Sequence, residues 1–148
     1  METEHSQDVF FMQAAISEAR AALDEYETPI GAVVVCRGRI VGRGHNRVEA
    51  FNDSTAHAEM QALSAAENTL GSKYLDECTL YVTVEPCVMC AGALFWCRIG
   101  RVVYGAADPK RGNSLYSPRL YHPKTVVENG VLEYDCAALM TQFFKKLR

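Results

Sequence analysis

The sequence predicts an α/β fold in which one mixed β-sheet is covered by helices on both faces. Strand-like and helix-like segments alternate along the chain, which favours this layered architecture. The length of 148 residues suits one domain, so we expect residues 1–148 to fold as a single unit. A content of 49% hydrophobic and 22% charged residues excludes disordered, collagen-like and coiled-coil proteins.

The first elements predicted are a helix and a β-hairpin. Apolar residues recur at intervals of three and four over residues 8–26, which is the spacing of a helix with one buried face. Thr28-Pro29 ends this helix. Residues 30–36 form a β-branched run, and a second run starts at Ile40 after Arg37-Gly38-Arg39. This pattern predicts a hairpin, whose antiparallel strands make the sheet mixed.

The central part of the chain predicts a helix, a strand and a second helix. Asp53-Ser54-Thr55 supplies helix-capping residues before an alanine-rich segment over residues 56–68, and a polar loop precedes them. We therefore expect His57 in the first turn of that helix. Residues 79–84 alternate as a strand does, and Glu85-Pro86 ends it. Proline suits a first helical turn, so a helix is expected over residues 87–96.

The last third predicts two short strands separated by a long loop, and then a terminal helix. The strands are expected over residues 101–104 and 125–128. Residues 105–124 are rich in Gly, Pro, Ser and Asn without a clear period, and a loop of this length suggests a binding role. The terminal helix follows a turn at Asn129-Gly130. Its apolar face comprises Cys136, Leu139, Met140, Phe143 and Leu147.

Charge is distributed unevenly along the chain. The net charge is -3, but residues 1–97 hold 6 basic and 14 acidic residues (net -8), and residues 98–148 hold 9 and 4 (net +5). The basic last third suggests an anionic partner.

The cysteines and the N-terminus indicate a cytoplasmic protein. The opening METEHSQDVFFMQ has neither the basic nor the apolar region of a signal peptide. No stretch reaches the roughly 18 consecutive apolar residues of a membrane span, so we expect no membrane association. In a reducing compartment a close cysteine pair is more often a metal or catalytic site than a disulfide. The other four cysteines, Cys36, Cys78, Cys97 and Cys136, are interpreted as small core residues.

The motif that carries chemistry is His57-Ala58-Glu59 followed by Pro86-Cys87-Val88-Met89-Cys90. It matches the H-x-E…P-C-x-x-C signature of zinc-dependent nucleobase deaminases. Zn²⁺ prefers imidazole and thiolate ligands in tetrahedral geometry, and three protein ligands leave the fourth position for water. Cys87 and Cys90 are three residues apart and can chelate one ion. A helix N-terminus also favours the thiolates that bind metal.

Glu59 is expected to shuttle protons rather than to bind the metal. It lies two residues after His57, about 200° around a helix axis, which places it away from the ligand. It is therefore predicted to take a proton from the attacking water and to protonate the ring nitrogen and the departing amine. The alternative is a closed structural zinc site, which needs a fourth ligand. The sequence offers three candidates for that ligand: His45, His122 and Cys97.

Over residues 8–148 the sequence resembles the bacterial tRNA adenosine deaminases of the cytidine deaminase-like superfamily. The zinc motif is shared by the whole superfamily, whereas a wider set of segments carries the narrower resemblance. These segments are Pro29-Ile30-Gly31-Ala32-Val33, Gly44-His45-Asn46-Arg47, Thr55-Ala56-His57-Ala58-Glu59, Cys78-Thr79-Leu80-Tyr81-Val82-Thr83-Val84-Glu85-Pro86-Cys87, Met89-Cys90-Ala91-Gly92-Ala93, Arg98-Ile99, Arg101-Val102-Val103-Tyr104-Gly105-Ala106, Asp108-Pro109-Lys110 and Phe143-Phe144.

The resemblance implies a three-layer αβα cytidine deaminase-like fold with a mixed five-stranded sheet, a homodimer, and one Zn²⁺ per subunit. It implies conversion of adenosine to inosine at the wobble position of a tRNA anticodon stem-loop. Asn46 matches the residue that holds the target base, and the backbone of Ala58 matches a group that binds the base edge. Pro29 and Val84 match residues that line the base pocket. A plain turn residue is the alternative interpretation of Asn46.

RNA binding is expected from basic and aromatic residues in the last third, because single-stranded RNA is bound by charge and stacking. The candidates are Lys110, Arg111, Lys145, Lys146 and Phe144. Other residues of suitable type are Arg119, Lys124, Arg148, Tyr116, Tyr121 and Phe143. The chain departs from the bacterial pattern in two places. Ser54 replaces a usual proline, and residues 113–124 are shorter and lack a glycine-rich start.

Two other functions stay open at the level of sequence. One is a deaminase of a free nucleobase or nucleoside of the guanine or cytosine type, which would use the same zinc chemistry in a closed pocket. The other is a non-catalytic, zinc-stabilised RNA-binding module. Glu59 disfavours the second, since a closed structural site has no use for an acid-base carboxylate.

Overall fold

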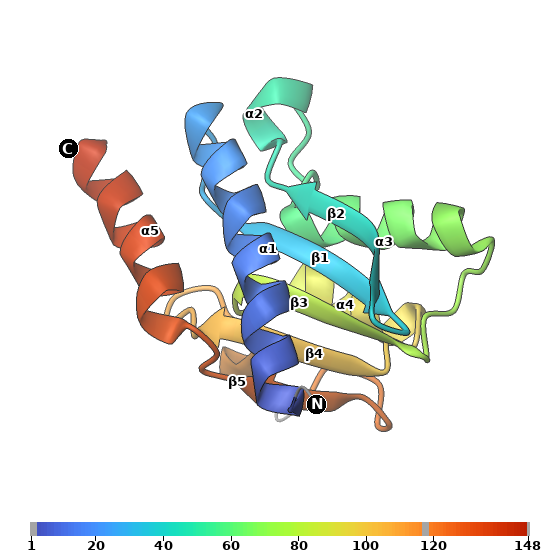
Figure 1. The fold of residues 1–148 in the computed structure, drawn as a ribbon. Coiled ribbons are helices and arrows are strands. Elements are labelled where there is room, and N and C mark those ends of the chain that lie inside the picture. Colours follow the sequence, from blue (N-terminus) through green and yellow to red (C-terminus); the bar gives the residue numbers. More distant parts are fainter. Residues whose placement is uncertain (1–2, 117–118, 148) are drawn as a thin grey trace.

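The computed structural model describes residues 3–116 and 119–147 and contains five strands, five α-helices and one 3-10 helix within them. Figure 1 shows their arrangement. In chain order the elements are α1 (Glu4–Asp24), β1 (Gly31–Cys36), β2 (Arg39–His45), α2 (Val48–Phe51), α3 (Ala58–Leu70), β3 (Cys78–Val84), α4 (Val88–Trp96), β4 (Arg101–Ala106), η1 (Asn113–Leu115), β5 (Val126–Asn129) and α5 (Glu133–Lys146).

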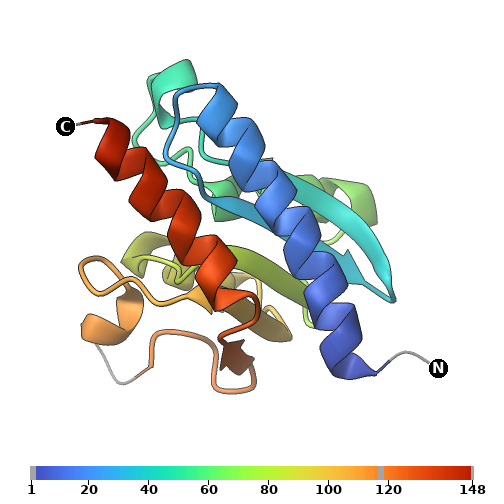
Figure 2. The ribbon, with the colours of Figure 1, turned by 60° about the vertical axis from the view of Figure 1, so that its left-hand side comes forward.

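The strands form one mixed sheet in the order β2-β1-β3-β4-β5. β1 is antiparallel to β2 and to β3, whereas β3, β4 and β5 run parallel. Helices α1 and α5 lie on one face, and α3 and α4 lie on the other (Figures 1 and 2). The predicted three-layer α/β fold with a mixed five-stranded sheet is confirmed.

Because both faces of the sheet are covered, its central strands are apolar on both sides. In β1, Ala32 and Val34 pack in the core under α3 and α4, while Val33 and Val35 pack under α1. Each face therefore has its own hydrophobic core, and the sheet separates them. Burial of apolar surface in these two cores is the main stabilising contribution expected for the fold.

Glycines in β2 allow α3 to lie directly on the sheet. A Cβ atom added to Gly44 would come within 2.4 Å of the Ala58 carbonyl oxygen, and one added to Gly42 would come within 2.3 Å of the Ala62 carbonyl oxygen. Any side chain at these positions would push the helix away. The start of α3 is thereby held against the end of β2.

An ion pair links the first helix to the parallel half of the sheet. The Arg101 guanidinium donates to both oxygens of Asp8 at 2.8 and 2.7 Å, and it also donates to Glu128 at 2.9 Å. The Tyr81 hydroxyl donates to Asp8 at 2.7 Å. Asp8 is buried and fully hydrogen-bonded, as a buried charge in a stable protein is expected to be.

The structure differs from the predicted elements at several helix ends. α1 begins at Glu4, because Thr3 caps it by accepting the Ser6 N–H. A short helix, α2, occupies part of the segment predicted as a polar loop. The segment predicted to cap α3 does not do so: Asp53 accepts the N–H and the hydroxyl of Thr55 instead. Within the described residues no helix is long and apolar enough to span a membrane.

Candidate active site

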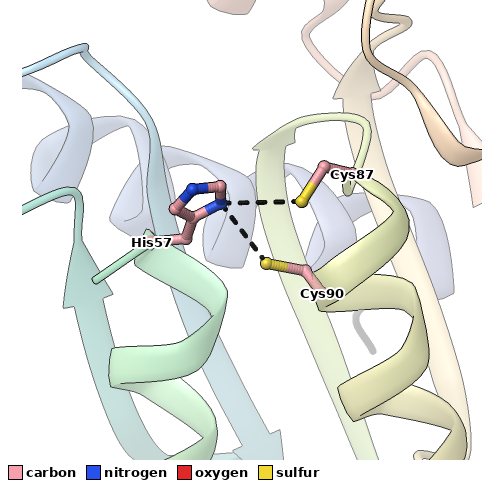
Figure 3. A group of neighbouring side chains, drawn as sticks. All are labelled: His57, Cys87 and Cys90. Atoms are coloured by element: carbon pink, nitrogen blue, oxygen red, sulfur yellow. Dashed lines mark hydrogen bonds between the residues drawn. The ribbon is translucent and has the colours of Figure 1, made fainter. Parts of the chain in front are cut away.

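Three predicted metal ligands meet between the starts of α3 and α4. The Nδ1 atom of His57 lies 3.6 Å from the Cys87 sulfur and 3.6 Å from the Cys90 sulfur. Figure 3 shows the three side chains pointing toward one another. One ligand atom from each residue lies within 4.8 Å of the others. The spacing predicted from sequence is thus realised as a compact cluster.

The backbone at the two helix starts directs these side chains inward. His57 and Cys87 are the N-cap residues of α3 and α4, with extended φ and ψ angles, rather than first-turn residues as predicted. Neither side chain makes the usual N-cap hydrogen bond to its own helix, so both are available to the cluster. The positive ends of two helix dipoles converge there, which stabilises negative sulfur.

Hydrogen bonding within the cluster favours the ionised form of one sulfur. A hydrogen bond from Cys90 lowers the pKa of the Cys87 thiol to about 4, against the opposing effect of burial, and His57 lowers it further. The hydrogen bond to Cys87 and burial raise the pKa of Cys90. The hydrogen bond to Cys87 also raises the pKa of His57. Together these groups form a proton-sharing set whose protons a cation would displace.

The donor set fits zinc. Two sulfurs and one imidazole nitrogen are the ligands that Zn²⁺ prefers, and an open catalytic site uses three of them. The alternative fourth ligands for a closed site are engaged elsewhere. His45 bonds to Glu18 and Glu25, each at 3.1 Å, and the His122 ring lies 5.8 Å from that of Phe95.

The third candidate, Cys97, hydrogen-bonds the Leu94 carbonyl at the end of α4. Among the described residues the cluster at His57 therefore contains three ligand groups, which is the composition of an open site.

Glu59 is a buried carboxyl beside the cluster. It lies in the first turn of α3 and is 4% exposed. Burial raises the pKa of Glu59 to about 7, and the charge on Cys87 adds to this effect, while backbone hydrogen bonding opposes it. A carboxyl group with such a pKa can both bind and release a proton at neutral pH.

Asn46 connects the end of β2 to the start of α3. Its side-chain oxygen accepts the N–H of Ala58 at 2.9 Å, and its backbone N–H donates to the Ile30 carbonyl at 3.2 Å. Asn46 is 7% exposed and Ala58 is fully buried. The resemblance assigns the backbone of Ala58 to the base edge, and here the N–H of that backbone is engaged by Asn46. The amide nitrogen of Asn46 remains as the donor for a ligand.

The two residues expected to line a base pocket lie at the same end of the sheet. Pro29 lies two residues before the start of β1 and Val84 ends β3, and these strands are antiparallel neighbours. The Gly31 N–H donates to the Thr83 hydroxyl at 3.2 Å and ties the two strand ends together. Both Pro29 and Val84 are buried.

The basic residues expected to contact RNA fall into two groups. Lys110 and Arg111 are exposed in the loop after β4, where the Asp108 carboxylate accepts both of their N–H groups at 3.0 Å. The positive charge of Arg111 lowers the pKa of His57, in opposition to the hydrogen bond from Cys87, so the Arg111 side chain lies near the cluster. The second group, residues 144–146, is exposed near the end of α5, on the left of Figure 1.

Tyr121 is not available for stacking on a base, contrary to the prediction. It is 7% exposed, and its hydroxyl accepts a hydrogen bond from the Asn113 amide at 2.9 Å. The apolar ring fills the core under α4, so its polar end needs a buried partner. Arg148, also named among the basic residues, lies outside the described part of the chain.

Sequence reasoning missed Glu85 as a residue that organises the loop after β4. It is 6% exposed, and its two carboxylate oxygens accept the N–H groups of Asp108 at 3.2 Å and Ser114 at 3.1 Å. The Asn113 amide donates to the Pro86 carbonyl at 2.8 Å. The signal in the sequence was an acidic residue between an apolar strand and Cys87, a predicted metal ligand.

Comparisons with known proteins identify the family of this chain. The family model of the MafB19-like deaminases matches residues 5–148. A tRNA-specific adenosine deaminase of Bacillus subtilis (strain 168) is 46% identical over 149 residues, covering 97% of this chain and 92% of that protein.

Two solved structures are also similar. One, from a study of A-to-I editing by tRNA:A34 deaminases at the wobble position of transfer RNA, is 42% identical. It covers 88% of this chain and 98% of its own, with a TM-score of 0.81. A guanine deaminase from Nitrosomonas europaea is 26% identical over 97% of this chain and 85% of its own, also with a TM-score of 0.81. The chain therefore belongs to the MafB19-like deaminase family and, within it, groups with the tRNA-specific adenosine deaminases.

Proposed function

We propose that this protein is a zinc-dependent hydrolytic deaminase that converts adenosine to inosine at the wobble position of a tRNA anticodon. We further propose that residues 1–148 form one deaminase domain with one zinc ion. The observation that carries the activity is the open cluster of His57, Cys87 and Cys90 beside the buried acid Glu59. A cluster of this composition next to a carboxyl group that titrates near neutrality suits hydrolysis.

Sequence identity supports tRNA rather than a free base as the substrate. The fold alone does not discriminate, because the tRNA deaminase structure and the guanine deaminase structure have the same TM-score of 0.81. Sequence identity discriminates between them, because it is 42% for the tRNA deaminase and 26% for the guanine deaminase. The net charge of +5 over residues 98–148 also suits a polyanion.

In the proposed mechanism, His57, Cys87 and Cys90 hold the metal. A zinc ion in such a site supplies a water molecule activated for attack near neutral pH. Glu59 takes up one proton from the attacking water and delivers it to the ring nitrogen. It then takes the second proton of that water, now on the hydroxyl group of the attacked carbon, and delivers it to the amine. The C–N bond breaks, the C=O bond forms, and the amine leaves as ammonia. The Glu59 pKa of about 7 suits both halves of this transfer. The Asn46 amide and the pocket residues Pro29 and Val84 orient the base.

A parallel substrate assay tests this proposal. Purified protein is given an anticodon stem-loop with a wobble adenosine, free guanine and free cytosine, and inosine and ammonia are measured. We expect inosine in the RNA and little ammonia from the free bases. Deamination of a free base without activity on the RNA would overturn the tRNA assignment in favour of the rival nucleobase deaminase.

The E59Q variant tests the role of Glu59 in the same assay. Glutamine preserves shape but cannot shuttle a proton, so we expect activity to fall by at least about 100-fold. Zinc content, measured by atomic absorption, is expected to stay at one ion per chain. Retained turnover would contradict the proton shuttle, and loss of zinc would show that Glu59 helps to bind the metal.

We propose that the loop after β4 and the end of α5 bind RNA phosphates and bases. Lys110, Arg111, Lys145 and Lys146 would bind phosphates, and Phe144, which is 47% exposed, would stack on a base. Removal of one lysine–phosphate interaction should reduce the slope of log affinity against log salt by roughly 1. Filter binding of K110A and K145A variants across a salt series measures this change.

We propose that the protein is a homodimer that acts in the cytoplasm, where its tRNA substrate would be found. An apolar stripe on α4 supports a dimer. It consists of Val88 (46% exposed), Gly92 and Trp96 (76% exposed), which follow one another at intervals of one helical turn. Nothing lies within 4 Å of a Cβ built on Gly92, so the stripe is open to a second copy. Light scattering of wild-type protein should give twice the chain mass, and W96E should reduce it to one chain mass.

A further inference from the structure

Two cysteines outside the metal cluster face each other across neighbouring strands. Cys36 ends β1 and Cys78 begins β3, and the two residues are directly opposite in the antiparallel register. Both belong to the core under α3 and α4, so their side chains lie on the same face of the sheet. They sit at the end of β3 away from Val84, and thus away from the metal cluster.

The hydrogen-bonding pattern shows which kind of pair they form. The Cys78 N–H donates to the Leu75 carbonyl at 3.0 Å, and the Cys78 carbonyl accepts the Gly100 N–H at 3.1 Å. Both backbone groups of Cys78 therefore point away from β1. The backbone N–H of Asn46 donates to the Ile30 carbonyl just before β1, so by alternation residues 32, 34 and 36 direct their backbone N–H and C=O groups toward β2. The register irregularity between Val34 and Val35 comes from an extra residue, Val41, in β2, so the alternation along β1 continues to Cys36. Cys36 and Cys78 thus form a non-hydrogen-bonded pair.

A non-hydrogen-bonded pair is the closer of the two antiparallel arrangements. Its Cα atoms are about 4.5 Å apart, and its side chains approach each other more closely than in the hydrogen-bonded kind. A disulfide spans Cα distances of about 4.4–6.8 Å, so this pair is within reach without movement of the strands. Burial raises the pKa of Cys78 to about 12, and a hydrogen bond that joins it to the Cys36 thiol adds to this effect.

The surroundings keep the pair in register and leave one thiol accessible. Arg37 follows Cys36 and Glu77 precedes Cys78, and these two side chains form an ion pair at 2.8 Å. Cys36 is partly exposed beside the tight turn at Arg37 and Gly38, whereas Cys78 is 3% exposed. A small reagent can reach the first thiol but not the second.

We propose that Cys36 and Cys78 are a modification site that low-molecular-weight disulfides of the glutathione class convert to a cross-strand disulfide. The Cys36 thiolate attacks one sulfur of the reagent and forms a mixed disulfide, releasing one reagent thiol. The Cys78 thiolate then attacks the Cys36 sulfur and releases the second reagent thiol. The protein loses two electrons and two protons, and the reagent is reduced to two thiols.

The site is independent of the proposed deaminase activity, and its test does not rely on that activity. Zinc-loaded full-length protein is incubated with oxidised glutathione, free thiols are alkylated, and peptides are mapped by mass spectrometry. We expect a cross-linked pair of peptides containing Cys36 and Cys78, lighter by two hydrogen atoms than the reduced pair. The linkage encloses a loop of about 40 residues, so the Tm should rise by several degrees.

Variants separate the two steps. C78A is expected to stop at a glutathione adduct on Cys36, and C36A is expected to give neither adduct nor cross-link. C136A is the matched control. Cys136 lies in α5, is fully buried against β4 at Gly105, and has no cysteine partner among the described residues, so the cross-link should form unchanged. Wild-type protein that keeps a stable adduct on Cys36, stays fully alkylated at both positions, or links Cys78 to Cys97 would overturn the proposal.

Discussion

Substitutions of Asn46 can separate effects on stability from effects on activity, because the oxygen and the nitrogen of its side-chain amide have different roles. Its oxygen accepts the Ala58 N–H at 2.9 Å at the start of α3. Its nitrogen is the donor proposed to hold the substrate base. Replacement by aspartate keeps an acceptor in place and removes the donor, whereas replacement by alanine removes both.

The two variants should differ in stability, although both lose the donor to the base. N46A leaves the buried Ala58 N–H without a partner, which costs about 1–3 kcal/mol. At about 2–4 °C per kcal/mol, its Tm should fall by roughly 2–12 °C. N46D keeps the hydrogen bond, and a carboxylate is favoured at a helix N-terminus, so its Tm should change by less than about 3 °C.

The same substitution should be costly for turnover. N46D loses one donor and places an acceptor against the base, a combined penalty of about 2–4 kcal/mol. This corresponds to a fall of roughly 30- to 1000-fold in kcat/KM. Differential scanning calorimetry and inosine formation on the anticodon stem-loop measure the two effects. If N46D is as unstable as N46A, or turns over within about threefold of wild type, the division of roles is wrong.

Three further predictions follow from the ion pair, the loop and the metal cluster. Burial would raise the pKa of Asp8, but hydrogen bonds from Arg101 and Tyr81 lower it overall. Because its folded-state pKa is lowered, the Asp8 carboxylate stabilises the fold at pH values above its unfolded pKa near 3.9, so D8N should lose stability at pH 7. The difference should shrink as pH falls below about 4 and disappear once pH is below the lowered pKa of folded Asp8. Urea unfolding at several pH values measures this, and a constant difference would contradict it. In G112A the new Cβ would lie 2.4 Å from the Glu85 carboxylate, so the loop must move. KM for the stem-loop should rise several-fold with kcat nearly unchanged, and an equal fall in kcat would place the defect at the metal cluster instead. Removal of metal with a chelator should abolish turnover and lower the Tm, because the ligands come from two helices, and added zinc should restore both. Activity that survives complete chelation would contradict metal dependence.

Patterns that repeat along the chain were predictable from the sequence. The apolar spacing of α1 and α5 and the β-branched runs of β1 and β3 indicate their type directly, since burial on one or two faces imposes these periods. Spacing within one helix start predicted that Cys87 and Cys90 lie together, and the H-x-E…P-C-x-x-C signature predicted that His57, from another helix start, joins them. His57, Cys87 and Cys90 meet in the structure as the motif requires.

Features that depend on contacts between distant segments were not predictable. The caps of α3 failed as predictions because Asp53 satisfies a local turn, leaving Asn46, from the preceding strand, to bond the Ala58 N–H. Tyr121 looked like a stacking residue, but its ring enters the core. The sequence placed Glu85 only at the end of a strand, and its role depends on two N–H groups that lie more than 20 residues away.

The arrangement around Glu85 limits how this enzyme can be remodelled. Glu85, Pro86 and Cys87 are consecutive, and each has a separate role. The Glu85 carboxylate holds the loop after β4, the Pro86 carbonyl accepts a hydrogen bond from Asn113 of that loop, and Cys87 belongs to the cluster. Insertion or deletion of one residue between Val84 and Cys87 would disturb all three at once. Changes of length are better placed after Leu115, beyond the last of these anchors. A library built there would vary the substrate surface while the hydrolytic centre keeps its geometry.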